Sequence, residues 1–299
     1  MSITIILMFI GVLLAIQVIG IIYKSFSTLS GNNTNALPVF MAIWAGGLGV
    51  VLTIASIILN RTFEISAVTF VAAIFGGLSF AVGGILYIRV LSLGSFIWST
   101  LMMNLSNFLP VVFALAFLGE TISIRQIVGV FVILSILFVM SVKTKTGDRP
   151  FTAKWMILAL VMMLGNGGLI SAQKTQTHYM EGTQTVEFLA LMFVFTSVFS
   201  LLWLLCAKLF AKQNIQNKPV PIGPLMRLTA AMAVCIGTGN ILNMILMRHI
   251  TAAVQFPLSV GAGIVLSAIV GVKLYREKPT WRLYLSAAML IVGVVLLGA

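Results

Sequence analysis

The side chains most able to take part in chemistry are amides and hydroxyls inside long apolar runs, and they are densest between residues 92 and 107. On a helix turning 100° per residue they form two adjacent stripes. One stripe holds Ser92, Ser95, Ser99 and Ser106, and the other holds Thr100, Asn104 and Asn107. An amide cannot satisfy all its donors and acceptors within its own helix, so Asn104 and Asn107 predict a polar cavity. The serines have an alternative, because a hydroxyl can bond back to its own helix.

Amides in other apolar runs are further candidates, although bonding between helices explains them nearly as well. Tyr87 and Trp98 would supply aromatic walls beside the two stripes. The predicted lining residues are Asn104, Asn107, Ser99, Trp98, Gln17, Tyr87, Asn166, Gln173, Asn240, Asn243 and Gln255. All the polar members of this set are uncharged, which favours a neutral or zwitterionic solute over a strongly charged one.

Groups for catalysis or metal binding do not come together in this sequence. His178 and His249 have no second ligand at metal-binding spacing. Cys206 and Cys235 lie in apolar runs, where packing is the expected role. The glycine-rich stretches lack the spacing of a phosphate-binding loop, and close helix packing explains them with fewer assumptions than hinges do. We therefore predict no catalytic residue, no metal and no cofactor.

The elements that position these side chains must be membrane helices. Apolar residues make up 60% of the 299 residues, charged residues only 8%, and the mean hydropathy is +1.14. A soluble domain has roughly a quarter of its residues charged. The composition therefore argues against soluble enzymes, nucleic-acid readers and disulfide-built secreted scaffolds, and it predicts an all-α integral membrane protein.

Ten apolar runs, each near the roughly 20 residues that cross the hydrocarbon core, predict ten transmembrane helices. They fall at residues 3–23, 38–59, 67–88, 94–118, 124–142, 155–173, 188–207, 226–247, 252–272 and 282–298. None alternates as a membrane barrel strand would. The first run lacks the basic start of a signal peptide, so we expect it to remain as a span.

The charged residues indicate how the helices are oriented. Lys and Arg outnumber Asp and Glu by 18 to 6, and none of them falls in the middle third of a predicted span. In short loops this excess indicates the anionic face of a membrane as partner, and not a nucleic acid. Fourteen basic residues lie on one side, against Arg61, Arg125, Lys174 and Arg248 on the side of the termini. By the positive-inside rule, loops 143–154 and 208–225 are cytoplasmic and both termini point outward.

An internal repeat is visible near an offset of 157 residues. Residues 119–125, GETISIR, align without gaps with residues 276–282, REKPTWR, and each copy has a Glu followed five residues later by an Arg. At an offset of 156, Gly11 and Gln17 align with Gly167 and Gln173. The alternative is that the Glu and Arg residues only cap short loops.

The repeat has a topological consequence, because each copy holds five spans. Five is an odd number, so the second copy enters the membrane from the opposite side and the repeat is inverted. We predict one five-helix repeat in residues 1–150 and a second in residues 151–299, with a central cavity between them near the membrane midplane.

Ten spans in two halves, with Pro110 in the fourth span ahead of Gly119 and Glu120, resemble the drug/metabolite transporter superfamily of the EamA type. The resemblance covers the whole chain through loose motifs, so it bears on the fold more than on the substrate. The second half departs from the pattern, with Arg276 before Glu277 and Pro257 early in the ninth span. Members of this family are usually described with cytoplasmic termini, in conflict with the charge count.

These observations favour a secondary transporter of a small polar or amphipathic metabolite in the cell (inner) membrane, working by alternating access. No nucleotide-binding motif is present to supply energy, and the resemblance implies export. An importer or facilitator of a sugar-like solute and a non-transporting membrane scaffold are the alternatives, and an enzyme would need reactive groups at depth that the spans do not offer. The sequence leaves the oligomeric state undecided, and a homodimer is one possibility.

Overall fold

The computed structural model describes residues 3–31, 33, 35–60, 63–119, 123–141, 152–181, 183–210, 220–249, 252–276 and 281–298. Within these residues the regular structure is helical: α1 (Ile3–Ser30), α2 (Ala36–Asn60), α3 (Ala67–Leu93), α4 (Phe96–Leu105), the 3-10 turn η1 (Ser106–Phe108), α5 (Leu109–Phe117), α6 (Ile124–Ser141), α7 (Ala153–Met180), α8 (Thr185–Phe210), α9 (Ile222–His249), α10 (Ala252–Tyr275) and α11 (Trp281–Gly298). In this described part, seven helices are long and apolar enough to cross a membrane. The chain is therefore a multi-pass membrane protein.

The helices fall where the apolar runs predict them, but several are longer. Helix α1 continues to Ser30 and α7 to Met180, whereas the apolar runs end at residues 23 and 173. Hydropathy detects only the segment in hydrocarbon, whereas a backbone leaving it keeps its helical hydrogen bonds. Hydroxyl groups fix some of the beginnings, since Ser66, Ser95 and Thr152 accept hydrogen bonds from backbone N–H groups three residues ahead.

The predicted span 94–118 is interrupted near its middle. Helix α4 ends at Leu105, the 3-10 turn η1 follows, and α5 begins at Leu109 with Pro110 in its first turn. Proline has no N–H to donate to the carbonyl of Ser106, and this carbonyl instead accepts from the N–H of Leu109. The backbone keeps right-handed helical dihedrals through this turn, so the span continues across it, and Asn104 and Asn107 lie at its level.

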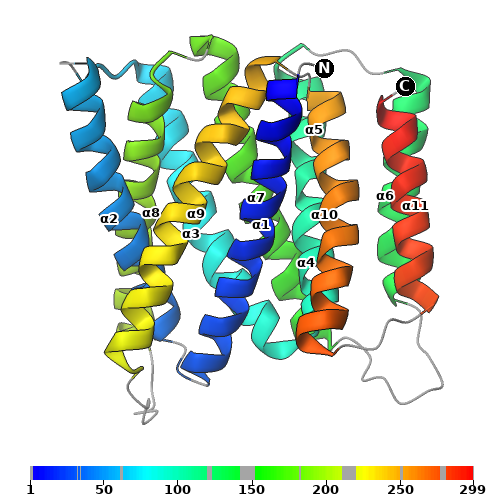
Figure 1. Cartoon of the computed structure of the whole chain (residues 1–299), viewed down its shortest axis with the longest axis horizontal. Coiled ribbons are helices and arrows are strands. Elements are labelled where there is room, and N and C mark those ends of the chain that lie inside the picture. Colours follow the sequence, from blue (N-terminus) through cyan, green and yellow to red (C-terminus); the bar gives the residue numbers. More distant parts are fainter. Residues whose placement is uncertain are drawn as a thin grey trace.

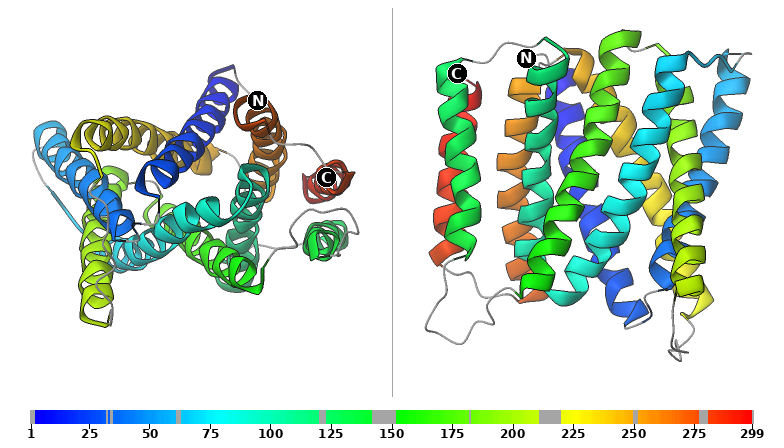
Figure 2. Two further views of the ribbon diagram at one scale, coloured as in Figure 1. Left: turned by 90° about the horizontal axis from the view of Figure 1, so that it is seen from below. Right: turned by 180° about the vertical axis from the view of Figure 1, so that it is seen from behind.

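The helices stand side by side in an up-and-down bundle, with both ends of the chain at the upper end (Figure 1). Helix α3 packs against α7 and α8, α2 against α8, α1 against α9, and α10 against α4. Helices α6 and α11 pack on each other at one edge, where α11 also contacts α10 (Figure 2). The first half of the chain thus contacts the second throughout the bundle.

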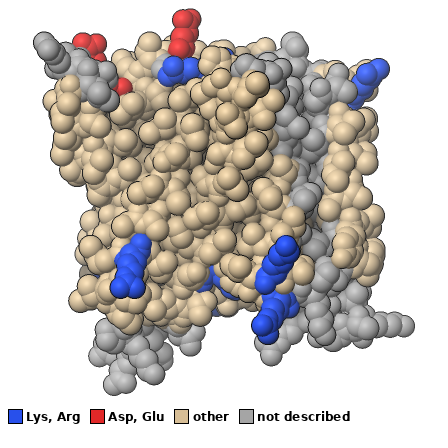
Figure 3. Space-filling model, in the orientation of Figure 1, with Lys and Arg blue, Asp and Glu red and all other residues tan. Residues whose placement is uncertain are grey.

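Charged side chains lie toward the two ends of the bundle. On the face in Figure 3, a broad tan band free of charged side chains separates the basic residues near the lower end from the acidic and basic residues at the upper end. The structure adds that two charged residues near helix ends are inside the protein, since Lys174 is only 8% exposed and Glu187 only 6%. Ser56 on α2 donates a hydrogen bond of 2.5 Å to Oε1 of Glu187 on α8.

Candidate functional site

A cavity of about 140 Å³ lies between α1, α3, α4, η1, α7, α9 and α10. Its lining residues are Val12, Ile16, Ile19, Tyr23, Phe80, Tyr87, Met103, Asn104, Asn107, Asn166, Leu169, Ile170, Gln173, Ile236, Gly239, Asn240, Asn243, Phe256 and Ser259. A cavity of ~150 Å³ is large enough for one benzene-sized molecule. The conformation therefore has room for a small solute or a few waters.

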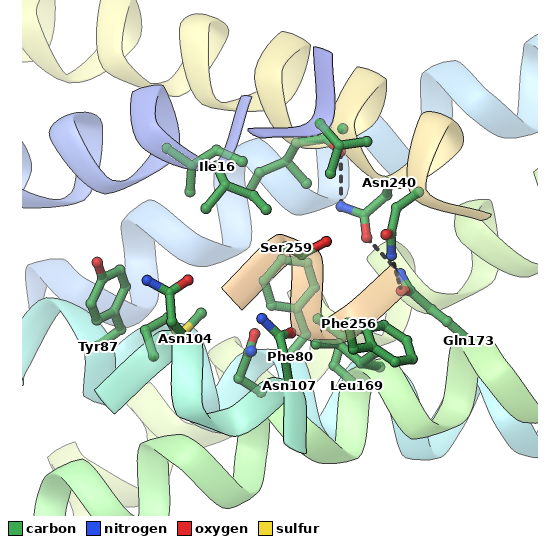
Figure 4. A pocket seen from close by; sticks show the side chains of 18 of the residues that line it. Ile16, Phe80, Tyr87, Asn104, Asn107, Leu169, Gln173, Asn240, Phe256 and Ser259 are labelled. Atoms are coloured by element: carbon green, nitrogen blue, oxygen red, sulfur yellow. Dashed lines mark hydrogen bonds between the residues drawn. The ribbon is translucent and has the colours of Figure 1, made fainter. Parts of the chain in front are cut away.

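Seven of the eleven residues predicted from sequence line this cavity. They are Tyr87, Asn104, Asn107, Asn166, Gln173, Asn240 and Asn243. Figure 4 shows Tyr87 toward one end of the cavity, Gln173 and Asn240 toward the other, and the two asparagines Asn104 and Asn107 between them. The structure thus brings together amides that lie up to 139 residues apart, from Asn104 to Asn243.

Asn104 and Asn107 reach the cavity from the 3-10 turn in the fourth span and from the helical turn before it. Asn104 is in the last turn of α4 and Asn107 is in η1. Asn104 is 5% exposed and its side chain lies against Gly263 of α10, where an added Cβ would come within 2.8 Å of Oδ1. Neither amide makes a hydrogen bond to any other residue in the described part of the chain. Their donors and acceptors are therefore available to a molecule in the cavity.

Asn166 on α7 donates a hydrogen bond to the Ser106 hydroxyl in η1, and four further amides form a relay across α7, α9 and α10. Nε2 of Gln255 donates to Oδ1 of Asn243 at 2.8 Å, and Nδ2 of Asn243 donates to Oε1 of Gln173 at 3.4 Å. Nε2 of Gln173 donates to Oδ1 of Asn240 at 2.5 Å, and Nδ2 of Asn240 donates to the backbone oxygen of Ile236 at 2.8 Å. These four side chains are called the amide relay below.

The direction of the amide relay is fixed at both ends. A backbone carbonyl can only accept, so the carbonyl of Ile236 requires the amino group of Asn240 and leaves its oxygen for Gln173. At the other end, Gln255 donates to the backbone oxygen of Asn243 at 3.3 Å as well as to its side chain. Reversing one amide would place two donors or two acceptors face to face, so the four orientations support one another.

Four predicted residues do not line the cavity. Gln17 joins α1 to α10, donating to the backbone oxygen of Gly263 at 3.2 Å and accepting from Ser267 at 3.1 Å. Gln255 is a member of the amide relay that is 1% exposed and does not line the cavity. Ser99 bonds back to the backbone oxygen of Ser95 at 2.7 Å, the alternative that the sequence had left open. Trp98 is partly buried against the hydrophobic core.

Apolar and aromatic residues of the lining were missed from the sequence. The missed set includes Ile16, Tyr23, Phe80 and Phe256. An apolar side chain facing a cavity has the same sequence signal as one packed in a core, so polarity could not reveal them. Tyr23 had a weak signal, since it is the last residue of the apolar run 3–23, whose only strongly polar interior residue is Gln17.

The chemistry that this site supports is recognition by hydrogen bonds and apolar contact. No charged side chain is among the described residues that line the cavity. The described residues also contain no group of three His, Cys, Asp or Glu side chains that would hold a metal ion. Amides at several levels and aromatic rings between them suit a small uncharged molecule with polar groups.

Comparison with known proteins gives a fold likeness only. No family model matches the chain, and no curated protein matches it. Among solved structures, one described as the crystal structure of a protein is 17% identical and superposes with a TM-score of 0.63, covering 99% of this chain and 96% of that chain. The whole helical arrangement is therefore shared with a protein of solved structure.

Proposed function

We propose that this protein is a secondary transporter that carries a small, uncharged, polar or amphipathic metabolite across the membrane by alternating access, in the direction of export. The cavity would hold the solute while the two halves of the chain open it first to one side and then to the other. The binding groups would be Asn104 and Asn107 together with the three members of the amide relay that line the cavity, Gln173, Asn240 and Asn243.

The observation that carries this proposal is the state of Asn104 and Asn107. Two amides beside the 3-10 turn of a transmembrane span face a cavity and have no hydrogen-bond partner in the described residues. Their donors and acceptors are open to the cavity, so a solute with polar groups can bind them without displacing another side chain. Transporters bind their solutes at irregular points of their helices that line such a cavity.

Helix pairing supports the inverted repeat on which alternating access depends. If α1, α2, α3, α4 to α5 and α6 correspond to α7, α8, α9, α10 and α11, each contact between the two halves should have an equivalent. The contact of α1 with α9 then corresponds to the contact of α7 with α3. The contacts of α2 with α8, α4 with α10 and α6 with α11 each join a helix to its own counterpart, so a twofold axis maps each of them onto itself. All of these pairs are in contact, as a twofold axis through ten helices requires.

The helix bounds favour a different register for the first pair than the sequence alignment does. Helices α1 and α7 both have 28 residues and begin at Ile3 and Ala153, an offset of 150 in place of 156. Helices α3 and α9 begin at Ala67 and Ile222, an offset of 155. Their last described residues, Leu93 and His249, give an offset of 156. Residues 120 and 277, the two Glu positions of the aligned segments, lie outside the described residues.

Contacts at glycines agree with an offset of 150 between α1 and α7 and of 156 between α3 and α9. An added Cβ on Gly83 would lie 3.2 Å from the carbonyl carbon of Gly165, and one on Gly239 would lie 3.1 Å from Cβ of Ala15. Gly239 is Gly83 plus 156, and Gly165 is Ala15 plus 150. The closest approaches of α3 to α7 and of α9 to α1 are thus equivalent, which supports two superimposable halves.

The proposal agrees with the resemblance to EamA-type drug/metabolite transporters, and it assigns the protein to a cell membrane. Export is taken from that resemblance. Basic side chains are concentrated at the end of the bundle away from the termini, which on electrostatic grounds would face the anionic cytoplasmic leaflet.

Efflux from proteoliposomes tests the proposal. Vesicles containing the purified protein are loaded with a defined mixture of neutral amino acids, sugars and nucleosides, and the external solution is analysed by mass spectrometry over time. We expect selective loss of one solute or a few related ones, and no such loss from vesicles that hold the double variant Asn104→Leu, Asn107→Leu. Retention of the whole mixture, as in protein-free vesicles, would overturn the proposal, whereas accumulation of a sugar by vesicles or cells would identify an importer.

A further inference from the structure

The two ends of the cavity carry equivalent residues of very different chemistry. With an offset of 150 between α1 and α7 and of 156 between α3 and α9, Tyr23 corresponds to Gln173 and Tyr87 to Asn243. All four residues line the cavity. This correspondence depends on the inverted repeat of the proposed function.

At one end, two tyrosines join α1 to α3. The rings of Tyr23 and Tyr87 meet edge to face, with centroids 5.5 Å apart and planes at 82°. Tyr23 is 1% exposed and Tyr87 3% exposed. Next along α1, Nζ of Lys24 donates to the backbone oxygen of Leu91 at 2.7 Å, in the last turn of α3. This contact lies toward the ends of α1 and α3 that are opposite the termini of the chain (Figure 1).

At the other end, two amides join α7 to α9. Gln173 accepts from Asn243 at 3.4 Å and donates to Asn240 at 2.5 Å. This contact lies toward the ends of α7 and α9 on the side of the termini (Figure 1). Figure 4 shows Tyr87 and the pair Gln173 and Asn240 at opposite ends of the lining.

The two contacts correspond residue by residue. Tyr23 touches the ring of Tyr87, and its hydroxyl lies 3.3 Å from where a Cβ on Gly84 would be. Their equivalents on α9 are Asn243 and Asn240, the two residues that Gln173 binds. Lys24 also has an equivalent, Lys174, at the offset of 150. Residues at equivalent positions therefore close both ends of the cavity, with aromatic rings at one end and amides at the other.

We propose that these pairs are the two gates of the cavity: an aromatic gate, Tyr23 with Tyr87, and an amide gate, Gln173 with Asn243 on the side of the termini. Alternating access parts α1 from α3 to open the aromatic gate and parts α7 from α9 to open the amide gate. Each gate opens while the other stays closed, because the halves of an inverted repeat exchange conformations.

The chemistry of the gates makes the amide gate the one that selects the solute. Parting the two rings exposes apolar surface and breaks no hydrogen bond between them, and the neighbouring bond from Lys24 to the backbone oxygen of Leu91 lies at the helix ends. Parting Gln173 from Asn243 and Asn240 leaves donors and acceptors that must find new partners. A solute with hydroxyl or amide groups supplies those partners, and a purely apolar molecule does not. Opening toward the termini is therefore favoured by a hydrogen-bonding solute.

Side-specific cysteine labelling tests the gates without any solute. Cys206 and Cys235 are replaced by Ser, and Ser259→Cys in the cavity lining serves as reporter, because the Ser259 hydroxyl bonds only to the backbone of its own helix at Gln255. A charged, membrane-impermeant methanethiosulfonate is added to one side at a time, using right-side-out and inside-out vesicles whose orientation is read from a tag on a terminus.

We expect Asn243→Leu to raise the labelling rate from the terminus side by about fivefold, the effect of losing one hydrogen bond of the closed state, and to leave labelling from the opposite side unchanged. Gln173→Met should do the same. Tyr87→Leu should raise labelling only from the opposite side. The control Tyr179→Leu, at an exposed position on α7, should label as the parent does from both sides.

Two results would overturn the proposal: equal acceleration from both sides by one variant, or no acceleration by any of the three gate variants in protein that still gives a monodisperse size-exclusion profile. Because no solute is used, side-specific acceleration in a protein that moves no metabolite would leave the gates standing and overturn transport. Selective efflux without side-specific acceleration of labelling would support transport and overturn the gates.

Discussion

Among the residues that the structure describes, Asn104 and Asn107 differ from the other cavity amides in making no hydrogen bond to another side chain or backbone group. Asn104→Leu or Asn107→Leu should therefore leave the thermal midpoint of the free protein nearly unchanged, while removing the rise in midpoint that the solute found by efflux produces. Gln173→Leu strands Asn240 and Asn243 and should cost about 1–3 kcal/mol in stability. Thermal unfolding in detergent, with and without that solute, measures both effects. A full solute-dependent rise in both asparagine variants would mean that the site is elsewhere.

Gln17 illustrates the opposite case, a polar residue whose groups are both engaged by another helix. It connects α1 to Gly263 and Ser267 on α10 and does not line the cavity. Gln17→Ala should lower stability by about 1–2 kcal/mol through the lost bonds, and should leave the pH dependence of efflux unchanged because an amide does not titrate. Unfolding curves and a pH series in proteoliposomes check the two parts. Loss of proton-driven exchange in Gln17→Ala alone would contradict this role.

Close helix packing at glycine is the clearest feature at the scale of elements. An added Cβ on Gly83 would meet the backbone nitrogen of Asn166 at 3.0 Å, whereas one on Gly47 would meet nothing within 4 Å. Gly83→Leu should therefore push α3 away from α7 and reduce the yield of folded protein severely, and Gly47→Leu, on the exposed face of α2, should be tolerated. Size-exclusion profiles and unfolding midpoints measure this, and equal tolerance of both variants would refute the packing.

The sequence predicted the position of the helices better than their contacts. Apolar runs located α1 to α11 because burial in lipid requires continuous apolar residues, whereas the break at η1 depends on one proline, Pro110, within an otherwise apolar span. The inverted repeat stays a prediction. Two isolated identities, Gly11 with Gly167 and Gln17 with Gln173, predict an offset of 156 for its first pair, whereas the bounds of α1 and α7 favour 150, which aligns Lys24 with Lys174.

Polar residues within apolar runs identified most of the cavity lining, but polarity could not show which of them face the cavity and which join two helices. An amide in an apolar helix must have a partner, and the sequence does not say whether that partner is a solute or another helix. Asn104 and Gln17 therefore looked alike, and only the contacts of Gln17 with α10 distinguish them. Apolar walls such as Phe80 carry no signal at all, because rings line cavities and fill cores equally well.

At the scale of the whole molecule, the uneven distribution of basic residues predicts the orientation in the membrane. Fourteen of 18 Lys and Arg residues lie on the side away from the termini, so that side should be cytoplasmic. Single cysteines at positions 2 and 146, both outside the described residues, report the two sides in a protein freed of Cys206 and Cys235. We expect a membrane-impermeant thiol reagent to label position 2 in intact cells and not position 146. The reverse pattern would give the protein cytoplasmic termini, as is usual for the family it resembles.

The central claim is that one cavity between two inverted halves faces each side of the membrane in turn. The most direct measurement is the labelling of Ser259→Cys, with no gate altered, by an impermeant thiol reagent applied first from one side and then from the other, in sealed vesicles. The account predicts slow labelling from both sides while the vesicles remain impermeable to the reagent itself. Labelling from a single side only, or a continuous leak of reagent through the protein, would contradict alternating access.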